Sequence, residues 1–256
     1  MSDAIIVNPI LRGFNPDPSI LRVGEDYYIA TSTFEWYPGV QIHHSRDLRH
    51  WRLIARPLNR ASQLDMRGDP DSCGVWAPAL RHVNGLFHLI YTDVKRYGRT
   101  SGVGGSAGAS LRDTHNYLVT SPTIEGDWSD PVFLNSSSFD PSLFQDDDGR
   151  IYILNQLWDW RPGHNRFGGI VLQEYDPANR RLVDKRSLIF RGTELGYTEE
   201  PHIHKRNGFY YLLTAEGGTG WGHAVTLARS RDLLGPYEVH PDGPLVTSRD
   251  RPDALL

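Results

Sequence analysis

The chain has 256 residues, with 27 Lys plus Arg and 31 Asp plus Glu, so its formal net charge is −4. A protein whose main partner is nucleic acid needs a basic face, and this balance argues against that class. Hydrophobic residues make up 39% of the chain and form no long apolar run, which excludes a membrane span. The single cysteine, Cys73, excludes an internal disulfide framework and a cysteine-rich zinc site.

The N-terminal residues, Met1 to Gly13, lack a basic start followed by an apolar stretch. A secretory signal peptide has both features, so none is visible here. We therefore expect a cytoplasmic protein. The sequence leaves the oligomeric state, including a homo-oligomer, open.

The composition favours strands over helices. The chain contains 7 Trp, 12 Tyr and 9 Phe together with 25 Gly and 17 Pro. Aromatic residues are enriched in strands, whereas Gly and Pro are enriched in the turns that join them. No segment shows a sustained apolar period of 3.6 residues. These features predict an all-β fold.

One unit recurs four times along the chain. Its prolines, Pro18, Pro78, Pro141 and Pro201, are 60, 63 and 60 residues apart. Each unit reads as a short strand that opens on Pro, a Gly-containing turn and an aromatic-rich strand. Four strands per repeat of this length predict a β-propeller. We expect one propeller domain over 1–256, with blades opening near 17, 77, 140 and 200.

Acidic residues occupy one position of this repeat. Asp17, Ala77 and Asp140 are equivalent, and Glu199 or Glu200 takes the same place in the fourth unit. Because the first strand of each blade lines the central channel of a propeller, we expect these carboxylates to converge. A simple acid–Pro turn is the alternative, but Ala77 indicates that the fold needs no acid there. Like charges gathered without need are destabilising, which favours a function.

Converging carboxyl groups are the catalytic groups typical of glycoside hydrolysis. One stays ionised as base or nucleophile, while another is held protonated as the acid. A third carboxylate can orient the acid and raise its pKa. Aromatic side chains near the acids, Phe34 and Trp76 among them, could be platforms for sugar rings, with core packing as the alternative. For Tyr37 and Trp51 we expect core packing.

Five motifs, spread in order over nearly the whole chain, resemble one known family. They are Gly13–Ile20 (GFNPDPSI), Ser32–Val40 (STFEWYPGV), Val75–Pro78 (VWAP), Ser138–Ser142 (SFDPS) and Tyr197–His202 (YTEEPH). Together they resemble glycoside hydrolase family 43, and most closely its β-xylosidases.

The resemblance implies a five-bladed β-propeller and an inverting mechanism. Asp17 would be the general base, Glu199 the general acid and Asp140 the modulator of the acid's pKa. Phe34 and Trp76 would shape the pocket for the terminal xylose. An inverting mechanism implies carboxyl groups about 6.5–9.5 Å apart, which leaves room for the attacking water.

The sequence departs from the family pattern at two points. Glu200 follows Glu199, where the family has a small residue, so Glu200 is kept as an alternative acid. Four repeats are present, and we interpret the chain as ending before the fifth blade. No organic cofactor is implied. Relatives can hold a structural cation in the channel, but its usual His falls beyond this chain, and we assign no metal ligand.

We predict an exo-glycosidase that releases xylose from the non-reducing ends of xylo-oligosaccharides. An α-L-arabinofuranosidase acting on arabinosyl substrates is the alternative within the family. A retaining fructan-type hydrolase is less favoured, because Arg67–Pro70 matches its motifs poorly. From another class, a non-catalytic sugar-binding propeller or an inactive fragment remains an alternative.

Two further motifs are explained by loops. Gly104–Gly108 fits the G-x-S-x-G pattern of hydrolases but lies in a Ser/Gly-rich segment, so we expect a flexible loop there. Asp146–Gly149 hints at a calcium loop, yet it aligns with the hairpin turns of the other repeats and lacks the completing glutamate.

Overall fold

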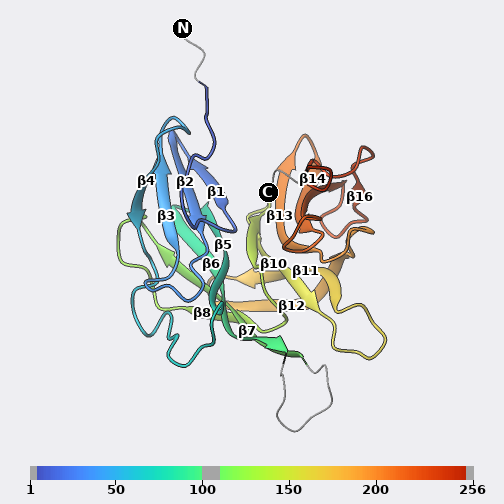
Figure 1. Ribbon diagram of the computed structural model, residues 1–256, viewed down its shortest axis with the longest axis horizontal. Coiled ribbons are helices and arrows are strands. Elements are labelled where there is room, and N and C mark those ends of the chain that lie inside the picture. The colour runs from blue at the N-terminus through green and yellow to red at the C-terminus, as the bar shows by residue number, and fades with distance from the viewer. Residues whose placement is uncertain (1–4, 100–109, 252–256) are drawn as a thin grey trace. The chain divides into compact units, whose positions relative to one another are not determined.

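The computed structural model describes residues 5–99 and 110–251, and every regular element in these ranges is a β-strand. The Gly104–Gly108 segment lies outside the described residues. Within them, no helix has the length and apolar character needed to cross a membrane. The chain divides into two compact units, Met1–Phe133 and Leu134–Leu256. Most of the strands are labelled in Figure 1.

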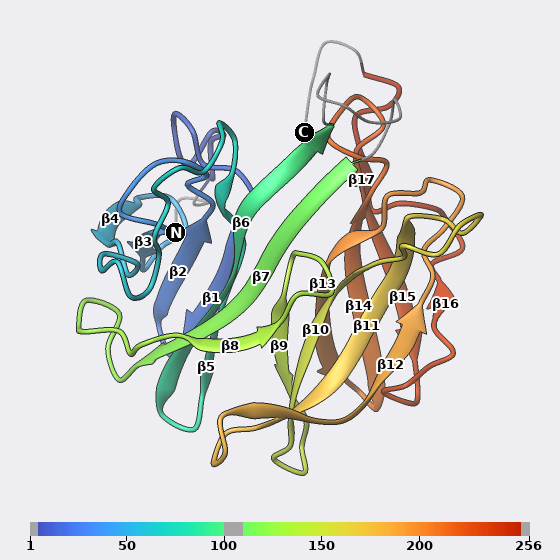
Figure 2. The same cartoon turned by 90° about the horizontal axis from the view of Figure 1, so that it is seen from below.

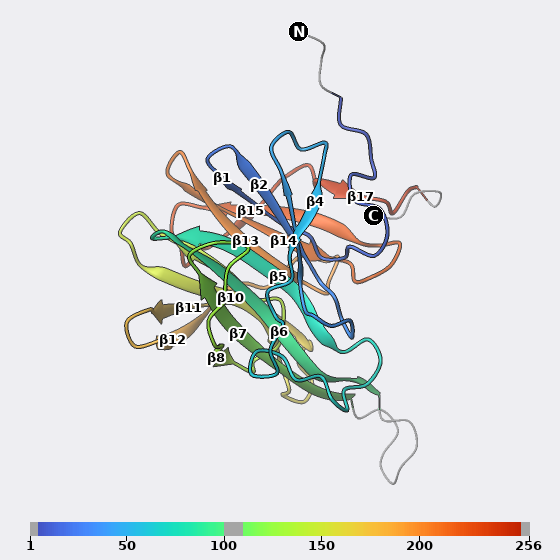
Figure 3. The same ribbon diagram turned by 90° about the vertical axis from the view of Figure 1, so that its left-hand side faces the viewer.

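The first unit holds two antiparallel sheets, each with four strands in chain order, and the last of these strands continues past Phe133 to Asn135. Residues 5–18 precede the first sheet and form a loop that contains no strand (Figure 3). In the second sheet, the long strands β6 and β7 lie side by side (Figure 2). The first sheet is β1 (Ser19–Val23), β2 (Asp26–Thr31), β3 (Gln41–Ser45) and β4 (Arg52–Ala55); the second is β5 (Gly74–Val83), β6 (Leu86–Arg99), β7 (Ser110–Ser121) and β8 (Val132–Asn135).

The second unit repeats this pattern. Its two sheets again follow chain order, except that the last position is shared by two short strands, β16 and β17, which both pair with β15. The third sheet is β9 (Ser142–Gln145), β10 (Ile151–Trp158), β11 (Phe167–Asp176) and β12 (Arg181–Phe190); the fourth is β13 (Glu199–Arg206), β14 (Phe209–Glu216), β15 (Ala224–Ser230), β16 (Glu238–Val239) and β17 (Val246–Thr247).

The Asn–Gly turns explain why the first two strands of two sheets form tight hairpins. Asn84 and Gly85 have φ angles of 51° and 78°, and Asn207 and Gly208 have 52° and 73°. Two successive residues with positive φ form the type I′ turn, whose twist matches that of the flanking strands. The repeat unit predicted from the sequence is confirmed at these hairpins.

The repeated prolines take two different places. Pro18 and Pro141 directly precede β1 and β9, as expected. Pro78 and Pro201 instead lie inside β5 and β13, where the pairing register shifts between Trp76 and Ala79 and between Glu199 and His202. The expectation that every unit's strand opens on Pro is therefore wrong for these two. Proline has no N–H, and an irregularity in the ladder accommodates it inside a strand.

Each unit has its own hydrophobic core, formed by the facing sides of its two sheets. In the first unit, Ile42 of β3 and Leu80 of β5 are both fully buried members of one cluster. In the second unit, Leu154 of β10 and Leu212 of β14 are buried in a corresponding cluster. Tyr37 belongs to neither cluster and its side chain is 52% exposed, so the expected core role for Tyr37 is wrong.

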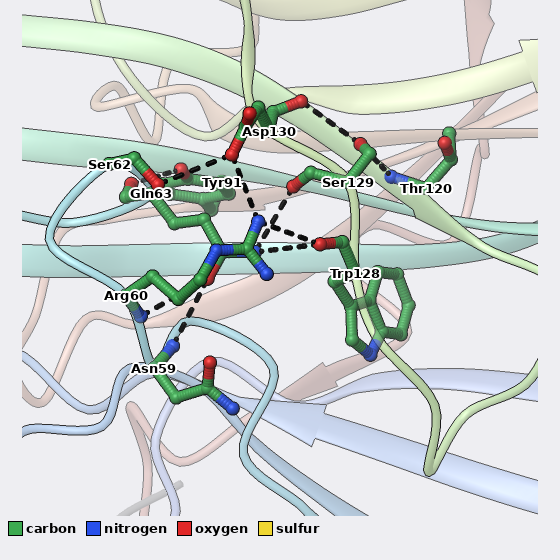
Figure 4. A network of polar contacts seen from close by, with 9 residues as sticks. All are labelled: Asn59, Arg60, Ser62, Gln63, Tyr91, Thr120, Trp128, Ser129 and Asp130. Atoms are coloured by element: carbon green, nitrogen blue, oxygen red, sulfur yellow. Dashed lines mark hydrogen bonds and ion pairs between the residues drawn. The ribbon is translucent and has the colours of Figure 1, made fainter.

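A buried glutamine joins the loop after β4 to the loop before β8 within the first unit (Figure 4). The Gln63 amide donates to the carbonyls of Trp128 and Ser129, both at 3.1 Å. Its oxygen accepts the N–H groups of Asn59 and Arg60 at 3.3 and 3.2 Å. One side chain thus satisfies polar backbone groups of two loops that carry little regular structure of their own.

Replacing Gln63 should therefore destabilise the first unit. We expect Gln63→Leu to lower the free energy of unfolding by about 2–3 kcal/mol, because it removes four hydrogen bonds to buried or partly buried backbone groups. The neighbouring Ser62→Ala removes only an exposed bond to Asp130 and should change it by about 0.5 kcal/mol or less. Urea unfolding measures both variants, and equal losses would contradict this assignment.

Two buried histidines make stability depend on pH. Burial lowers the pKa of His43 and of His88 below the ordinary value of 6.5. Their side chains are 8% and 6% exposed. Because the unfolded chain takes up these protons at a higher pH than the folded chain, stability is lost as the pH falls from 6.5 toward the lowered pKa values.

We expect His43→Leu and His88→Gln each to flatten the fall in unfolding free energy between about pH 7 and pH 5, because each removes one group that protonates more readily in the unfolded chain. The more exposed His240 gives the control variant His240→Gln. Thermal unfolding at a series of pH values measures the slope. A slope unchanged in both buried variants would contradict the expectation.

Candidate active site

The carboxylate of Asp17 is held by a serine that directly follows β2. The Ser32 hydroxyl, fully buried at the end of β2, donates to Asp17 Oδ2 at 2.5 Å. The Ser32 hydroxyl oxygen in turn accepts the Ala77 N–H at 2.7 Å. Because Ser32 also donates its backbone N–H to the Pro16 carbonyl, it joins the segment before β1 to the second sheet. Asp17 is the acceptor in this arrangement.

The aromatic residues expected at the site gather near this serine. The rings of Phe34 and Trp76 lie 5.7 Å apart between centroids, and Phe14 lies 5.7 Å from Phe34 on its other side. Trp76 also contacts Tyr97 edge-on at 4.7 Å, and its indole N–H donates to the Ser72 carbonyl. The Phe14 side chain is 58% exposed, so this row of rings reaches the surface.

A close backbone approach fixes where Phe34 lies. Phe34 and Val75 exchange two backbone hydrogen bonds of 3.0 and 3.1 Å outside the main sheets. Gly74 has a φ of 86°, and a Cβ there would come within 2.3 Å of the Phe34 carbonyl oxygen. Only glycine fits this position. The pairing places Phe34 next to the start of β5, which carries Trp76.

In the second unit, the Asp140 carboxylate accepts the backbone N–H of the residue before proline directly. In the first unit the Ser32 hydroxyl accepts that N–H and donates to Asp17. The Asp140 side chain is 8% exposed, and Oδ2 accepts the backbone N–H of Glu200 at 3.2 Å. Two residues on, the Ser142 hydroxyl donates to the Pro201 carbonyl. The start of β9 is thereby joined to the start of β13, and these strands lie side by side (Figure 2).

The backbone shows which residues of the four repeats are equivalent. Asp17, Ala77, Asp140 and Glu200 each precede a proline and have φ angles of 51°, 35°, 56° and 49°. Positive φ is uncommon for residues other than glycine and costs free energy at each position. The fourth member of the set is therefore Glu200. Glu199 pairs across to Ala215, as Trp76 pairs across to Thr92 in the second sheet.

Two further aromatic residues of the second unit flank its acids in the sequence and contact a common ring, that of Phe167. Phe167 contacts Phe139 at 6.3 Å and Tyr197 at 5.0 Å between centroids. Phe139 precedes Asp140, and Tyr197 lies two residues before Glu199. The Tyr197 side chain is 55% exposed. Sequence reasoning missed Tyr197 and Ser32 as members of the site, although both stood inside the motifs that carried the resemblance.

The predicted site residues fall in both units. Asp17, Phe34 and Trp76 belong to the first, and Asp140 and Glu199 to the second. The convergence of the three acids on one channel, and their separate roles, stay predictions. In the described ranges 5–99 and 110–251, no group of three or more His, Cys, Asp or Glu side chains is placed to hold a metal ion.

Comparison with known proteins assigns the family. The model of "Glycosyl hydrolases family 43" matches residues 6–255. The chain belongs to glycosyl hydrolase family 43. It is 65% identical over 249 residues to the xylosidase/arabinosidase 43B of Humicola insolens, covering 97% of this chain and 44% of the relative. It is 58% identical over 243 residues to a β-xylosidase of Bacillus subtilis (strain 168), covering 95% of this chain and 44% of the relative.

A solved structure, that of a xylan β-1,4-xylosidase from Bacillus halodurans C-125, superposes with a TM-score of 0.92 at 57% identity. The match covers 98% of this chain and 46% of that one. The family 43 resemblance and the all-β fold of four propeller blades, in a family of five-bladed propellers, are confirmed. The chain spans less than half the length of the relatives it matches.

The Asp17–Ser32–Ala77 arrangement can be tested through stability. We expect Ser32→Ala in this family 43 chain to lower the free energy of unfolding by about 1–3 kcal/mol, because it leaves a buried N–H and a carboxylate oxygen without this partner. The adjacent Thr31 gives the matched control, since its buried hydroxyl has no hydrogen-bond partner among the described residues. Thr31→Val should be neutral or stabilising in urea unfolding. A loss in Thr31→Val as large as that in Ser32→Ala would contradict the assignment.

Proposed function

We propose that this protein is an inverting exo-glycosidase that releases xylose from the non-reducing ends of xylo-oligosaccharides. Family membership and relatives named as β-xylosidases support this proposal. The observation that carries the catalytic assignment is the bond from Ser32 to Asp17. The Ser32 oxygen already accepts the Ala77 N–H, so the hydroxyl proton is directed at the Asp17 carboxylate. A donor of this kind favours the ionised form, which a general base needs.

Asp17 would remove a proton from the water that attacks C1 of the terminal sugar. Glu199 would protonate the leaving oxygen as the glycosidic bond breaks, so that the anomeric configuration inverts. Negative charge from Asp140 and the adjacent Glu200 favours the protonated form of such an acid. The Asp140 carboxylate would also orient Glu199 through its bond to the next residue's N–H. Phe34 and Trp76 would pack against the sugar.

Arabinofuranosidase activity is the second candidate, because the relative at 65% identity is itself named a xylosidase/arabinosidase. Hydrolysis of 4-nitrophenyl β-D-xylopyranoside and of 4-nitrophenyl α-L-arabinofuranoside separates the two. We expect the xyloside to be the better substrate. Saturable binding of xylose without turnover of either compound would favour the non-catalytic alternative.

Variants of the acids test the assigned roles. Asp17→Asn should lower kcat on every substrate by about 10²–10⁴-fold, because water activation is needed whatever the leaving group. Glu199→Gln should lower kcat by a similar factor on xylobiose but far less on 2,4-dinitrophenyl β-D-xylopyranoside, whose leaving group needs no proton. Glu200→Gln is the matched control and should not show this difference between substrates.

The stereochemistry of the product gives an independent check. We expect proton NMR of the first product formed from a β-xyloside to show α-xylose, as inversion demands. First release of β-xylose would contradict the inverting mechanism. Full activity of Glu199→Gln on xylobiose would instead move the acid to Glu200.

A further inference from the structure

Glu216, at the end of β14, is a fully buried carboxylate outside the acids discussed so far. Each of its oxygens accepts two hydrogen bonds. Oε1 accepts the Thr193 N–H at 2.8 Å and the Thr198 hydroxyl at 2.6 Å. Oε2 accepts the hydroxyls of Thr193 at 2.6 Å and Thr226 at 2.7 Å. These four hydrogen bonds offset the free energy cost of burying the carboxylate, which would be very large without partners.

The donors come mainly from one segment, the connection between β12 and β13. Thr193 and Thr198 lie near its two ends, whereas Thr226 lies on β15. The approach at Gly192 is close: a Cβ there would lie 1.8 Å from Thr198 Oγ1 and 2.8 Å from Glu216 Oε1. A backbone bond of 2.8 Å from the Gly217 N–H to the Gly196 carbonyl holds the middle of the segment. Glu216 thus fixes the course of the chain into β13.

The residue that follows this segment is Glu199. Its backbone lies between two fixed points, because Thr198 is bonded to Glu216 and the Glu200 N–H is bonded to Asp140. Glu199 also pairs across the sheet with Ala215, the neighbour of Glu216. We propose that Glu216, acting through Thr198, is the positioning residue for the acid Glu199. This inference rests on the proposed function, in which Glu199 protonates the leaving group.

Two threonines provide a matched pair of variants. Thr198→Val and Thr226→Val each remove one hydroxyl donor from Glu216 at a site that is 2% exposed, with almost no change of side-chain shape. Only Thr198 adjoins Glu199. A purely structural role of the network predicts the same effect of both variants, whereas positioning of the acid predicts a difference that depends on the leaving group.

We expect Thr198→Val, made in the intact protein, to lower kcat on xylobiose by about 10–100-fold, because small misplacements of a catalytic group are costly. On 2,4-dinitrophenyl β-D-xylopyranoside its kcat should fall by about threefold or less, since little protonation is needed. Thr226→Val should change the two substrates by equal factors. Thr198→Ser, which keeps the hydroxyl, should restore the wild-type ratio. If Thr198→Val does not fold, Glu216→Gln measured on the two substrates provides the same test.

The positioning role would be overturned if Thr198→Val lowered kcat on both substrates by the same factor. It would also be overturned if Thr226→Val showed the same leaving-group dependence of kcat as Thr198→Val. Glu199→Gln, measured in parallel, separates this result from failure of the proposed function. If Glu199→Gln depends on the leaving group and Thr198→Val does not, only the positioning inference fails. If Glu199→Gln shows no such dependence, its assignment as the acid fails first.

Discussion

In each unit, one hydrogen bond joins the start of the second sheet to the first sheet. Its donor is the backbone N–H of the residue before proline, Ala77 in the first unit and Glu200 in the second. In the second unit the Asp140 carboxylate accepts the Glu200 N–H directly. In the first, the Ser32 hydroxyl accepts the Ala77 N–H and donates its own hydrogen bond to Asp17. A residue in the left-handed region before Pro is conformationally costly, and these bonds help to hold it there.

This constraint gives the acids two properties at once. A side chain that accepts a fixed backbone or hydroxyl donor cannot turn freely, so Asp17 and Asp140 are orientated without any substrate. A hydrogen-bond donor also favours the ionised form of a carboxylate in general, which supports the roles proposed for Asp17 and Asp140. Glu199 lies one residue outside this position. Its orientation therefore needs other support, which the threonine bonds to Glu216 can supply.

Buried polar side chains form hydrogen bonds with loop groups that have no partner in the sheets. Gln63 serves two loops of the first unit through four bonds, and Glu216 serves the connection into β13 through its own four. Both are saturated by neutral donors or acceptors. Leaving any of these groups unmatched would cost a large part of the stability of a marginally stable domain. The connection held by Glu216 leads directly to Glu199, so the stability of that connection bears on the position of Glu199.

The sequence alone determined the repeat, its hairpin turns, the all-β class and the family, because Asn–Gly turns and strands of period two are local properties of the chain. It also named Asp17, Asp140 and Glu199, whose roles stay predictions. Only the tertiary structure decided that Glu200 is the fourth equivalent residue, that Pro78 and Pro201 lie where the pairing register shifts, and that Tyr37 is exposed. It alone revealed Ser32 as the partner of Asp17 and Glu216 as the partner of Thr198. Such contacts join residues 15 or more positions apart, and no local pattern records which distant donor a carboxylate will meet.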